Sequence, residues 1–203
     1  GWNPLSGDMN NAMAVTEDGG GSRTPMFETL YMYNLLDGQL YPLLAEGDYV
    51  WNDAMTEITV KLNPDAKWSD GTPVVAEDVA YTFDVHVKYE TNMGVAFKDY
   101  IDKVEAVDDS TAVIYAALTD DGVAKNPLML PLYLEQVYIL QTAWLETVEA
   151  RNGEDATAVK NDPAEDVVYS GPYKPFYADD QKVVLIRDDN YWGQAASMWG
   201  ALP

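Results

Sequence analysis

The stretch that decides the local fold is Trp68-Ser69-Asp70-Gly71-Thr72-Pro73, followed shortly by Glu77-Asp78-Val79. Before it, apolar Ile58, Val60 and Leu62 alternate with polar residues, which is the period of a half-buried strand. Ser69 to Pro73 has the composition of a tight turn, because Asp and Ser bond the backbone locally and Gly adopts positive φ. Glu77 and Asp78 lie where the first turn of a helix favours negative charge. The pattern therefore predicts a strand over 55–62, a tight turn, and a helix over 76–90.

The rest of the chain is predicted to form further short helices and strands joined by turns. Residues 6–25 have the composition of a loop, and Thr24-Pro25 predicts the start of a helix over 25–35. Turn residues at Asp37-Gly38, Asp108-Asp109-Ser110 and Ala178-Asp179-Asp180 predict hairpins, the last two with strands over 101–107 and 111–118 and over 173–177 and 182–187. Residues 142–151 have a helical pattern that ends at Asn152-Gly153. Residues 127–140 are apolar, and their period does not separate helix from strand.

The residue sequence of the turn from Ser69 to Pro73, here called the central turn, resembles a known family signature. It is similar to that of the family 5 extracellular solute-binding proteins of ABC transporters, the oligopeptide-binding type, in which Asp-Gly-Thr-Pro is followed by Ala-Glu-Asp-Val. Other segments resemble landmarks of the same family in the same order: Asn3-Pro4-Leu5, Phe27-Glu28-Thr29-Leu30, Pro42-Leu43-Leu44-Ala45-Glu46, residues 104–113, Ser170-Gly171-Pro172-Tyr173, and Asn190-Tyr191-Trp192-Gly193. Two residues depart from the family pattern. Val75 replaces a usual Thr, and Gln141 replaces a common Pro.

This resemblance implies an α/β protein with a type II periplasmic-binding-protein-like fold, of which only the first lobe is present. Such a lobe is expected to contain a mixed sheet with flanking helices and β-hairpins. All matched landmarks belong to the first lobe, and full-length members of the family are more than twice as long. We therefore expect residues 1–203 to be the first lobe of a truncated two-lobe protein, without the second lobe and the returning C-terminal segment.

The composition limits the partners of the chain. Its 203 residues include 12 basic and 34 acidic residues, for a formal charge of −22. This balance argues against nucleic-acid binding, which needs clustered Lys and Arg, and against docking on an anionic bilayer. The sequence has no cysteine and no apolar run of the length that spans a bilayer. We expect an extracytoplasmic protein, either periplasmic or a cell-surface lipoprotein, whose signal peptide is outside this chain.

No pattern in the sequence selects a catalytic or metal site. His86 is the single histidine, so the usual zinc sites are nearly excluded and His86 is expected to be a packed or surface residue. No Gly-x-Ser-x-Gly nucleophile elbow, phosphate-binding loop or dinucleotide fingerprint occurs. The adjacent Asp pairs lie in predicted turns, where Asp is expected for backbone reasons. We therefore predict no catalytic residue, no metal and no cofactor.

The candidate ligand-binding residues come from the aromatic content and from the resemblance. Trp51, Trp68, Trp144 and Trp192 have positions that core packing explains. In the family, the loop after the Asn-Pro strand and the segment after the central helix both face the ligand cleft. The resemblance therefore implies that residues 10–18 and 89–100 approach the ligand. The predicted binding residues are Asn10, Glu17, Tyr89, Phe97 and Tyr100.

The resemblance implies solute capture for an ABC importer, with hinge closure of two lobes on the ligand and recognition of the closed form by the permease. An oligopeptide is the first choice of ligand, because peptides are the commoner ligand of the family. An oligosaccharide, held by ring stacking on the many Tyr and Trp side chains, is the alternative. Two other classes stay open: a surface carbohydrate hydrolase, which needs paired carboxylates across a cleft, and an adhesion module. We expect a monomer that is not an enzyme.

Overall fold

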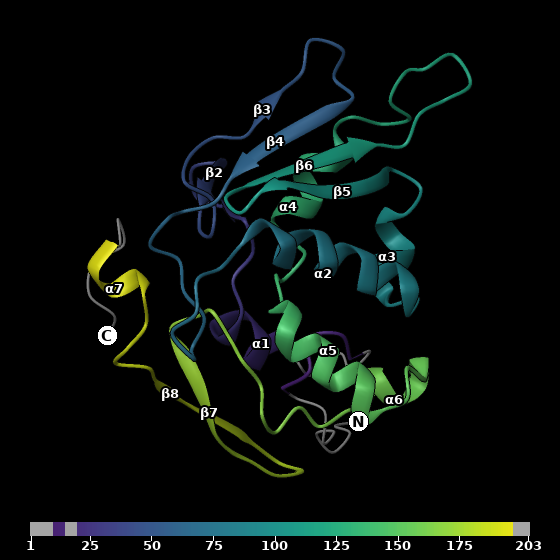
Figure 1. Cartoon of the computed structure of the whole chain (residues 1–203). Helices are drawn as coiled ribbons and strands as arrows, with labels where there is room; N and C mark the ends of the chain where they lie inside the picture. The colour runs from purple at the N-terminus through teal and green to yellow at the C-terminus, as the bar shows by residue number, and fades with distance from the viewer. Residues whose placement is uncertain (1–9, 15–19, 197–203) are drawn as a thin grey trace.

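A computed structural model describes residues 10–14 and 20–196 of the chain. The main sheet, which has four strands, lies at one end of the molecule, with α2 (Ala76–Lys88) and α3 (Asn92–Phe97) packed below it (Figure 1). Helices α5 (Thr142–Arg151) and α6 (Ala156–Lys160) form a further layer on the other side of α2. The hairpin of β7 (Tyr173–Ala178) and β8 (Val183–Arg187) lies at the opposite end from the sheet.

The main sheet consists of β3 (Val50–Trp51), β4 (Glu57–Lys61), β5 (Ile101–Asp108) and β6 (Thr111–Ala116), in the order β3-β4-β6-β5. Ile58 of β4 is paired with Ile114 of β6, and all three core residues Ile58, Val60 and Ile114 have no exposed surface. The alternation of apolar and polar residues that predicted β4 therefore matches its alternation of buried and more exposed side chains. The expected mixed sheet is wrong for the described residues, because every strand pair there is antiparallel.

The central turn has the local bonds that its composition predicts. Oδ1 of Asp70 accepts hydrogen bonds from the backbone N–H of Thr72 at 2.9 Å and from the Thr72 hydroxyl at 2.6 Å. Gly71 has a φ of +88°, in the left-handed region that favours glycine. Helix α2 then begins after Val75, whose N–H donates to the Asp78 carboxylate at 3.0 Å. Asp78 thus caps the helix although Val75 has no side-chain acceptor.

The predicted helix over 25–35 is wrong. Helix α1 (Gly20–Met26) ends where that helix was expected to begin, and its residues 20–25 were expected to be a loop. Residues further on form the hairpin of β1 (Tyr31–Asn34) and β2 (Gln39–Pro42). The turn explains this outcome, because Asn34 donates to Asp37 and accepts from the N–H of Leu36, while Gly38 has a φ of +70°. These bonds close a hairpin, as Asp37-Gly38 predicted, and stop a helix before it can propagate.

The apolar run over 127–140 contains only one regular element, the short helix α4 (Met129–Leu134). The residues after it follow an irregular path, yet Val137, Ile139 and Leu140 are almost fully buried. Burial on all sides explains why no period is visible in this part of the sequence. The predicted hairpins over 101–118 and 173–187 and the helix over 142–151 are confirmed by β5–β6, β7–β8 and α5. The last described element is α7 (Gly193–Ala196).

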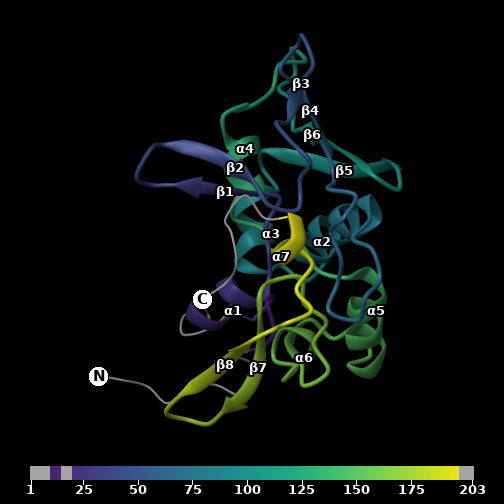
Figure 2. The same ribbon diagram turned by 90° about the vertical axis from the view of Figure 1, so that its left-hand side faces the viewer.

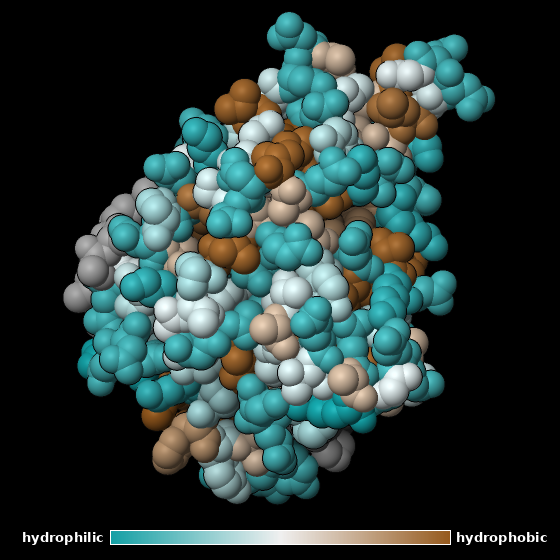
Figure 3. Space-filling view, in the orientation of Figure 1, coloured by the Kyte–Doolittle hydropathy of each residue, from teal (hydrophilic) through white to brown (hydrophobic). Residues whose placement is uncertain are grey.

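Helix α2 separates two hydrophobic cores. Val79 and Phe83 face the first core, which fills the space under the main sheet and includes Trp68. Val85 and Tyr89 face the second core, which α2 shares with Phe27 and the buried side of α5. The helix is therefore covered along both flanks, and its buried residues include the polar Asp78, Thr82 and His86. On the face of the molecule seen in Figure 3, hydrophilic residues predominate and apolar residues form separate patches.

Candidate functional site

The candidate site is a hollow between α1, the β1–β2 hairpin and the segment after α4. Figure 2 shows the hairpin and α1 on the same side of the molecule. The hollow has a volume of about 550 Å³, which is within the size range of small-molecule sites. We call it the aromatic hollow. Its lining is mostly apolar and aromatic, with two carboxylates: Thr24, Phe27, Glu28, Thr29, Met32, Tyr33, Leu43, Glu135, Tyr138, Pro172 and Tyr191.

Glu28 forms the floor of the hollow and holds distant parts of the chain together. Its carboxylate accepts hydrogen bonds from the Tyr191 hydroxyl and, at 2.9 Å, from Nε1–H of Trp192. Its backbone N–H donates to the Ser170 hydroxyl at 3.0 Å. Glu28 is only 5% exposed, and this burial raises the pKa of its carboxyl to about 7 although the two donors act in the opposite direction.

Close backbone packing beside Glu28 explains the glycine of the Ser-Gly-Pro-Tyr segment. The N–H of Gly171 donates to the carbonyl of Met26 at 2.8 Å. A Cβ at Gly171 would lie 2.5 Å from the carbonyl oxygen of Pro25, so no larger residue fits without a backbone shift. The family landmarks around Glu28, Gly171 and Trp192, far apart in sequence, therefore meet in one structural cluster.

Unlike Glu28, Glu135 has a carboxylate oxygen without a hydrogen-bond donor in the described part of the chain. Its Oε2 atom is shielded from solvent and accepts no hydrogen bond from the described residues. Burial raises the pKa of its carboxyl. Phe27 and Tyr138 form an aromatic wall of the same hollow, with their ring centroids 6.2 Å apart. The arrangement offers mainly apolar and aromatic surface, next to a carboxylate oxygen that has no hydrogen-bond partner among the described residues.

A second hollow of about 210 Å³ shares Tyr138 with the aromatic hollow and is lined by His86, so we call it the histidine hollow. Its wall also contains Ala12, Met13, Ala14, Thr91, Asn92 and Met93. The two segments that the resemblance implies near the ligand, 10–18 and 89–100, thus do meet here among the described residues. Nδ1 of His86 lies 2.7 Å from the Thr91 hydroxyl, and burial lowers the pKa of His86 to about 4, so the imidazole is neutral.

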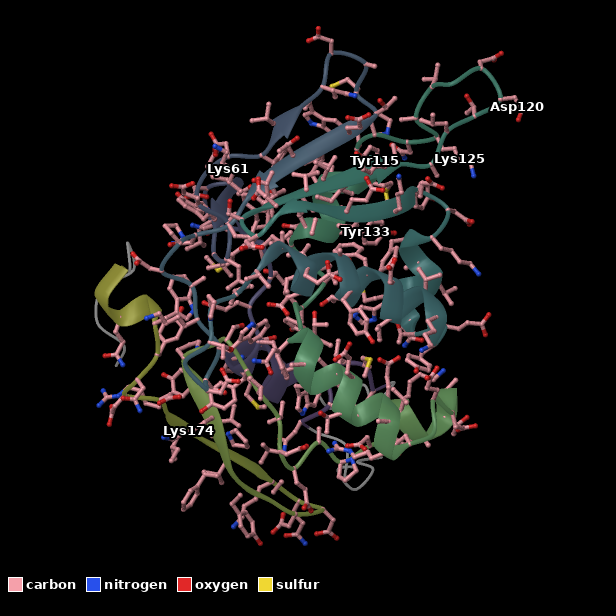
Figure 4. The ribbon with its side chains drawn as sticks, viewed as in Figure 1. Lys61, Tyr115, Asp120, Lys125, Tyr133 and Lys174 are labelled. Atoms are coloured by element: carbon pink, nitrogen blue, oxygen red, sulfur yellow. The ribbon has the colours of Figure 1, made fainter. Side chains whose placement is uncertain are left out.

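Two of the predicted binding residues have packing roles in this structure. Tyr89 is 2% exposed, and its hydroxyl donates to Glu149 at 2.6 Å. Phe97 is 1% exposed and packs against Phe83 and Tyr133. Figure 4 labels Tyr133 in the interior, and its hydroxyl donates to the carbonyl of Ala96 at 2.7 Å. Both rings are packed among residues of this chain and neither lines one of the two hollows, while their predicted contact with a ligand stays a prediction.

The other predicted binding residues have different placements. Tyr100 is partly exposed and stacks on Tyr133, with the ring centroids 6.5 Å apart. Asn10 is also partly exposed and lies outside both hollows, whereas its neighbour Asn11 is buried and donates to the carbonyl of Val159 at 2.8 Å. Glu17 lies outside the described residues. Ligand contact by Asn10, Glu17 and Tyr100 stays a prediction.

Sequence reasoning missed the residues that line the aromatic hollow, above all Tyr33, Glu135 and Tyr138. One signal was present: Glu135-Gln136 interrupts the apolar run over 127–140. A charged residue within such a run is costly to bury and therefore indicates a special environment. Tyr33 carried no comparable signal, because the predicted helix over 25–35 concealed its position in a hairpin.

The described residues contain no group of three or more His, Cys, Asp or Glu side chains that could hold a metal ion. None of their helices has the length and apolar character needed to cross a membrane. Figure 4 shows Lys61, Lys125 and Lys174 in widely separated places, so these three lysines do not form a common basic patch.

Comparison with known proteins gives the family context. Residues 39–198 match the family model described as bacterial extracellular solute-binding proteins, family 5 Middle. A relative from Agrobacterium fabrum, called probable peptide-binding protein YejA, is 30% identical over 157 residues, which cover 76% of this chain and 24% of that protein. The matched region spans 22% to 24% of the length of the first three curated relatives.

Solved structures have the same fold. A periplasmic oligopeptide-binding protein of an ABC transporter from Thermotoga maritima, crystallised with mannohexaose, gives a TM-score of 0.76 at 24% identity, covering 96% of this chain and 33% of that one. Listeria monocytogenes OppA bound to peptide gives a TM-score of 0.73 at 20% identity, covering 94% of this chain and 38% of that one. The fold is therefore that of part of a type II periplasmic binding protein, as expected.

Proposed function

Because the chain belongs to the bacterial extracellular solute-binding proteins of family 5, we propose that it forms the first lobe of a protein that captures a solute and delivers it to an ABC permease. The observation that carries the proposal is the fold match to a periplasmic oligopeptide-binding protein, which covers 96% of this chain but only 33% of that protein. The aromatic hollow supplies one wall of the ligand site, and the remaining part of the protein closes over it.

An oligopeptide is the proposed ligand. The support is that one relative is called a probable peptide-binding protein and that one protein of the same fold was crystallised with peptide. Backbone hydrogen bonds hold the peptide, and a largely apolar hollow with a few polar groups accepts its side chains. The protein acts outside the cytoplasmic membrane, as a monomer that is either free in the periplasm or anchored by a lipid.

An oligosaccharide is the second candidate ligand. The Thermotoga maritima protein of the same fold was crystallised with mannohexaose. The aromatic hollow offers the rings of Tyr33, Tyr138 and Tyr191, on which sugar faces stack. A thermal-shift screen of the full-length protein against peptides and oligosaccharides distinguishes the two classes, because a ligand that binds only the native state raises its melting temperature.

A matched pair of variants tests whether the aromatic hollow takes part. Tyr33 lines the hollow and is 47% exposed, whereas Tyr177 lies outside it on the β7–β8 hairpin and is 48% exposed. In the full-length protein, Tyr33→Ala should weaken binding of the ligand found in the screen by about 1–3 kcal/mol, the range for losing a contacting aromatic ring. Tyr177→Ala should leave the dissociation constant unchanged. Equal effects of the two changes, measured by calorimetry, would place the ligand elsewhere.

Residues 1–203 alone should bind this ligand poorly. One lobe offers part of the contacts, and these must first offset the entropy cost of association. Calorimetry on this chain should therefore show affinity weaker than micromolar. Micromolar or tighter binding would contradict capture between two lobes and would favour a binding module that acts alone.

A further inference from the structure

The carboxyl of Glu28 lies between a fixed cluster of side chains and the aromatic hollow. Its Oε1 atom accepts from the Tyr191 hydroxyl and its Oε2 atom accepts from Nε1–H of Trp192, residues 163 and 164 positions further along the chain. The backbone N–H of Glu28 is bonded to the Ser170 hydroxyl. Glu28 and Tyr191 both line the hollow, whose volume of about 550 Å³ is large enough for a solute group. A change in what fills the hollow is therefore a change in the surroundings of this carboxyl.

The same cluster accommodates Glu28 with or without a proton. An indole N–H only donates, whereas a tyrosine hydroxyl both donates and accepts. A proton on Glu28 therefore belongs on Oε1, from which it is donated to the hydroxyl oxygen of Tyr191, while Oε2 still accepts from Trp192. Each charge state keeps two hydrogen bonds without any movement of the chain. Glu28 can thus take up a proton while the lobe stays folded.

The walls of the hollow do not balance a negative charge on Glu28. No Lys or Arg occurs among the described residues that line it, and Arg23 of α1 lines the histidine hollow instead. The other ionisable side chains of the aromatic hollow are Tyr33 of β1, Glu135 and Tyr138 of the segment after α4, and Tyr191. Water in the hollow favours the carboxylate form of Glu28, and an apolar solute group that displaces this water disfavours it.

We propose that Glu28 binds a proton together with the solute: an uncharged apolar or aromatic group fills the aromatic hollow, and Oε1 of Glu28 takes up a proton from the solvent. Such a group, for example the side chain of a hydrophobic peptide residue, therefore binds more tightly at low pH than at high pH. The pKa of about 7 means that both charge states of Glu28 are populated near neutral pH. This inference deepens the proposed function and rests on it for the nature of the solute.

The probe is N-acetyl-Ala-Leu-Ala amide, which has an apolar side chain and no group that titrates near neutral pH. Calorimetry on the full-length protein, in two buffers of different ionisation enthalpy, gives the number of protons taken up per bound peptide. In the unchanged protein this number should be a positive fraction at about pH 7. The dissociation constant should rise by about threefold to tenfold from about pH 6 to about pH 8.5, because a Glu28 pKa about one unit higher in the complex gives nearly tenfold.

Three variants identify the proton-binding group. Glu28→Gln resembles the protonated residue, because its amide N–H donates to Tyr191 and its carbonyl accepts from Trp192. It should take up no proton, and at every pH it should bind the probe about as tightly as the unchanged protein does at about pH 6. Tyr191→Phe removes a donor that lowers the pKa of Glu28, so the midpoint of the pH dependence should move to higher pH. Glu135→Gln changes the other carboxylate of the hollow and should keep the proton uptake.

Probe binding without proton uptake, or uptake that persists in Glu28→Gln, would overturn the inference while leaving solute capture in place. If Glu28→Gln does not fold, Tyr191→Phe decides, and an unmoved midpoint overturns the inference. If the blocked peptide does not bind, 2-phenylethanol is the uncharged aromatic probe.

This second probe should raise the melting temperature more at about pH 6 than at about pH 8.5 in the unchanged protein, but equally at both in Glu28→Gln. Equal rises in the unchanged protein, or no rise at either pH, would overturn the inference. A peptide screen without any binder rejects the proposed peptide function and leaves this test of Glu28 in place.

Discussion

The indole Nε1–H of Trp68 donates a hydrogen bond of 2.9 Å to Oδ2 of Asp78, ten residues further along the chain. The same carboxylate accepts from the N–H of Val75 at 3.0 Å and from the N–H of Thr142 at 2.8 Å. Asp78 therefore joins the end of the central turn, the first turn of α2 and the first turn of α5. It is 3% exposed, so water cannot replace these bonds.

Replacement of Asp78 should be among the most damaging single changes in this lobe. Asp78→Ala leaves the buried indole N–H of Trp68 and two part-buried backbone N–H groups without their acceptor, and we expect it to lower the free energy of unfolding by about 3 kcal/mol or more. Asp84, which is exposed on the same helix, is the matched control, and Asp84→Ala should change stability by less than about 0.5 kcal/mol. Urea denaturation measures both, and similar losses would show that the Asp78 bonds contribute little.

Gly71 should be required for its backbone conformation alone. Its φ is +88°, yet a Cβ built there meets no atom within 4 Å. Gly71→Val should therefore destabilise the lobe by about 1–3 kcal/mol, chiefly through backbone strain. Gly47 also has open space around a Cβ but no positive φ, so Gly47→Val is the control and should cost clearly less. An unchanged urea midpoint for Gly71→Val, combined with lost ligand binding, would indicate a role in ligand contact instead.

Glu28 should make the stability of the lobe depend on pH. Its pKa is raised from 4.5 to about 7 in the folded state, so the folded protein holds a proton that the unfolded chain releases. The contribution of Glu28 is therefore most favourable below pH 4.5, decreases as the pH rises towards about 7, and is constant above that. The decrease should be on the order of 3 kcal/mol.

Glu28→Gln separates this effect from that of other carboxylates. Asp162, for example, has its pKa lowered to about 2 by Arg151, and its contribution is lost as the pH falls. The difference in unfolding free energy between the unchanged protein and Glu28→Gln should shrink, or reverse, between acidic and neutral pH. Urea titrations at several pH values measure this difference. A difference that stays constant with pH would mean that Glu28 titrates normally in the folded protein.

Phe97 and Tyr100 should respond differently to truncation. Phe97 is enclosed by Phe83 and Tyr133, so Phe97→Ala should cost about 3–5 kcal/mol of stability, as for other buried aromatic residues. Tyr100 is partly exposed and stacks on Tyr133, and Tyr100→Ala should cost less than half as much. Thermal or urea unfolding compares the two variants. A larger loss for Tyr100 would mean that the stacked pair, not the enclosed ring, organises this end of the core.

The elements whose hydrogen bonds are local could be predicted from the sequence. The strand, turn and helix around Asp70 follow from alternation, from an Asp that bonds to Thr72, and from a glycine with positive φ. The hairpin turn at Asp37-Gly38 is equally local. The family landmarks also allowed the fold to be predicted, although the expected mixed sheet is antiparallel in the described residues.

Which residues are buried, and which line the hollows, depends on the packing of elements that are distant in the sequence. Tyr89 was predicted to face a ligand, but its environment depends on Glu149, 60 residues away, which accepts its hydroxyl hydrogen bond. Glu135 and Tyr138 share a hollow with Glu28 and Tyr33, from which they are separated by about half the chain. No local pattern encodes such contacts, because burial and cavity shape arise from how elements pack on one another and not from the period within any one of them.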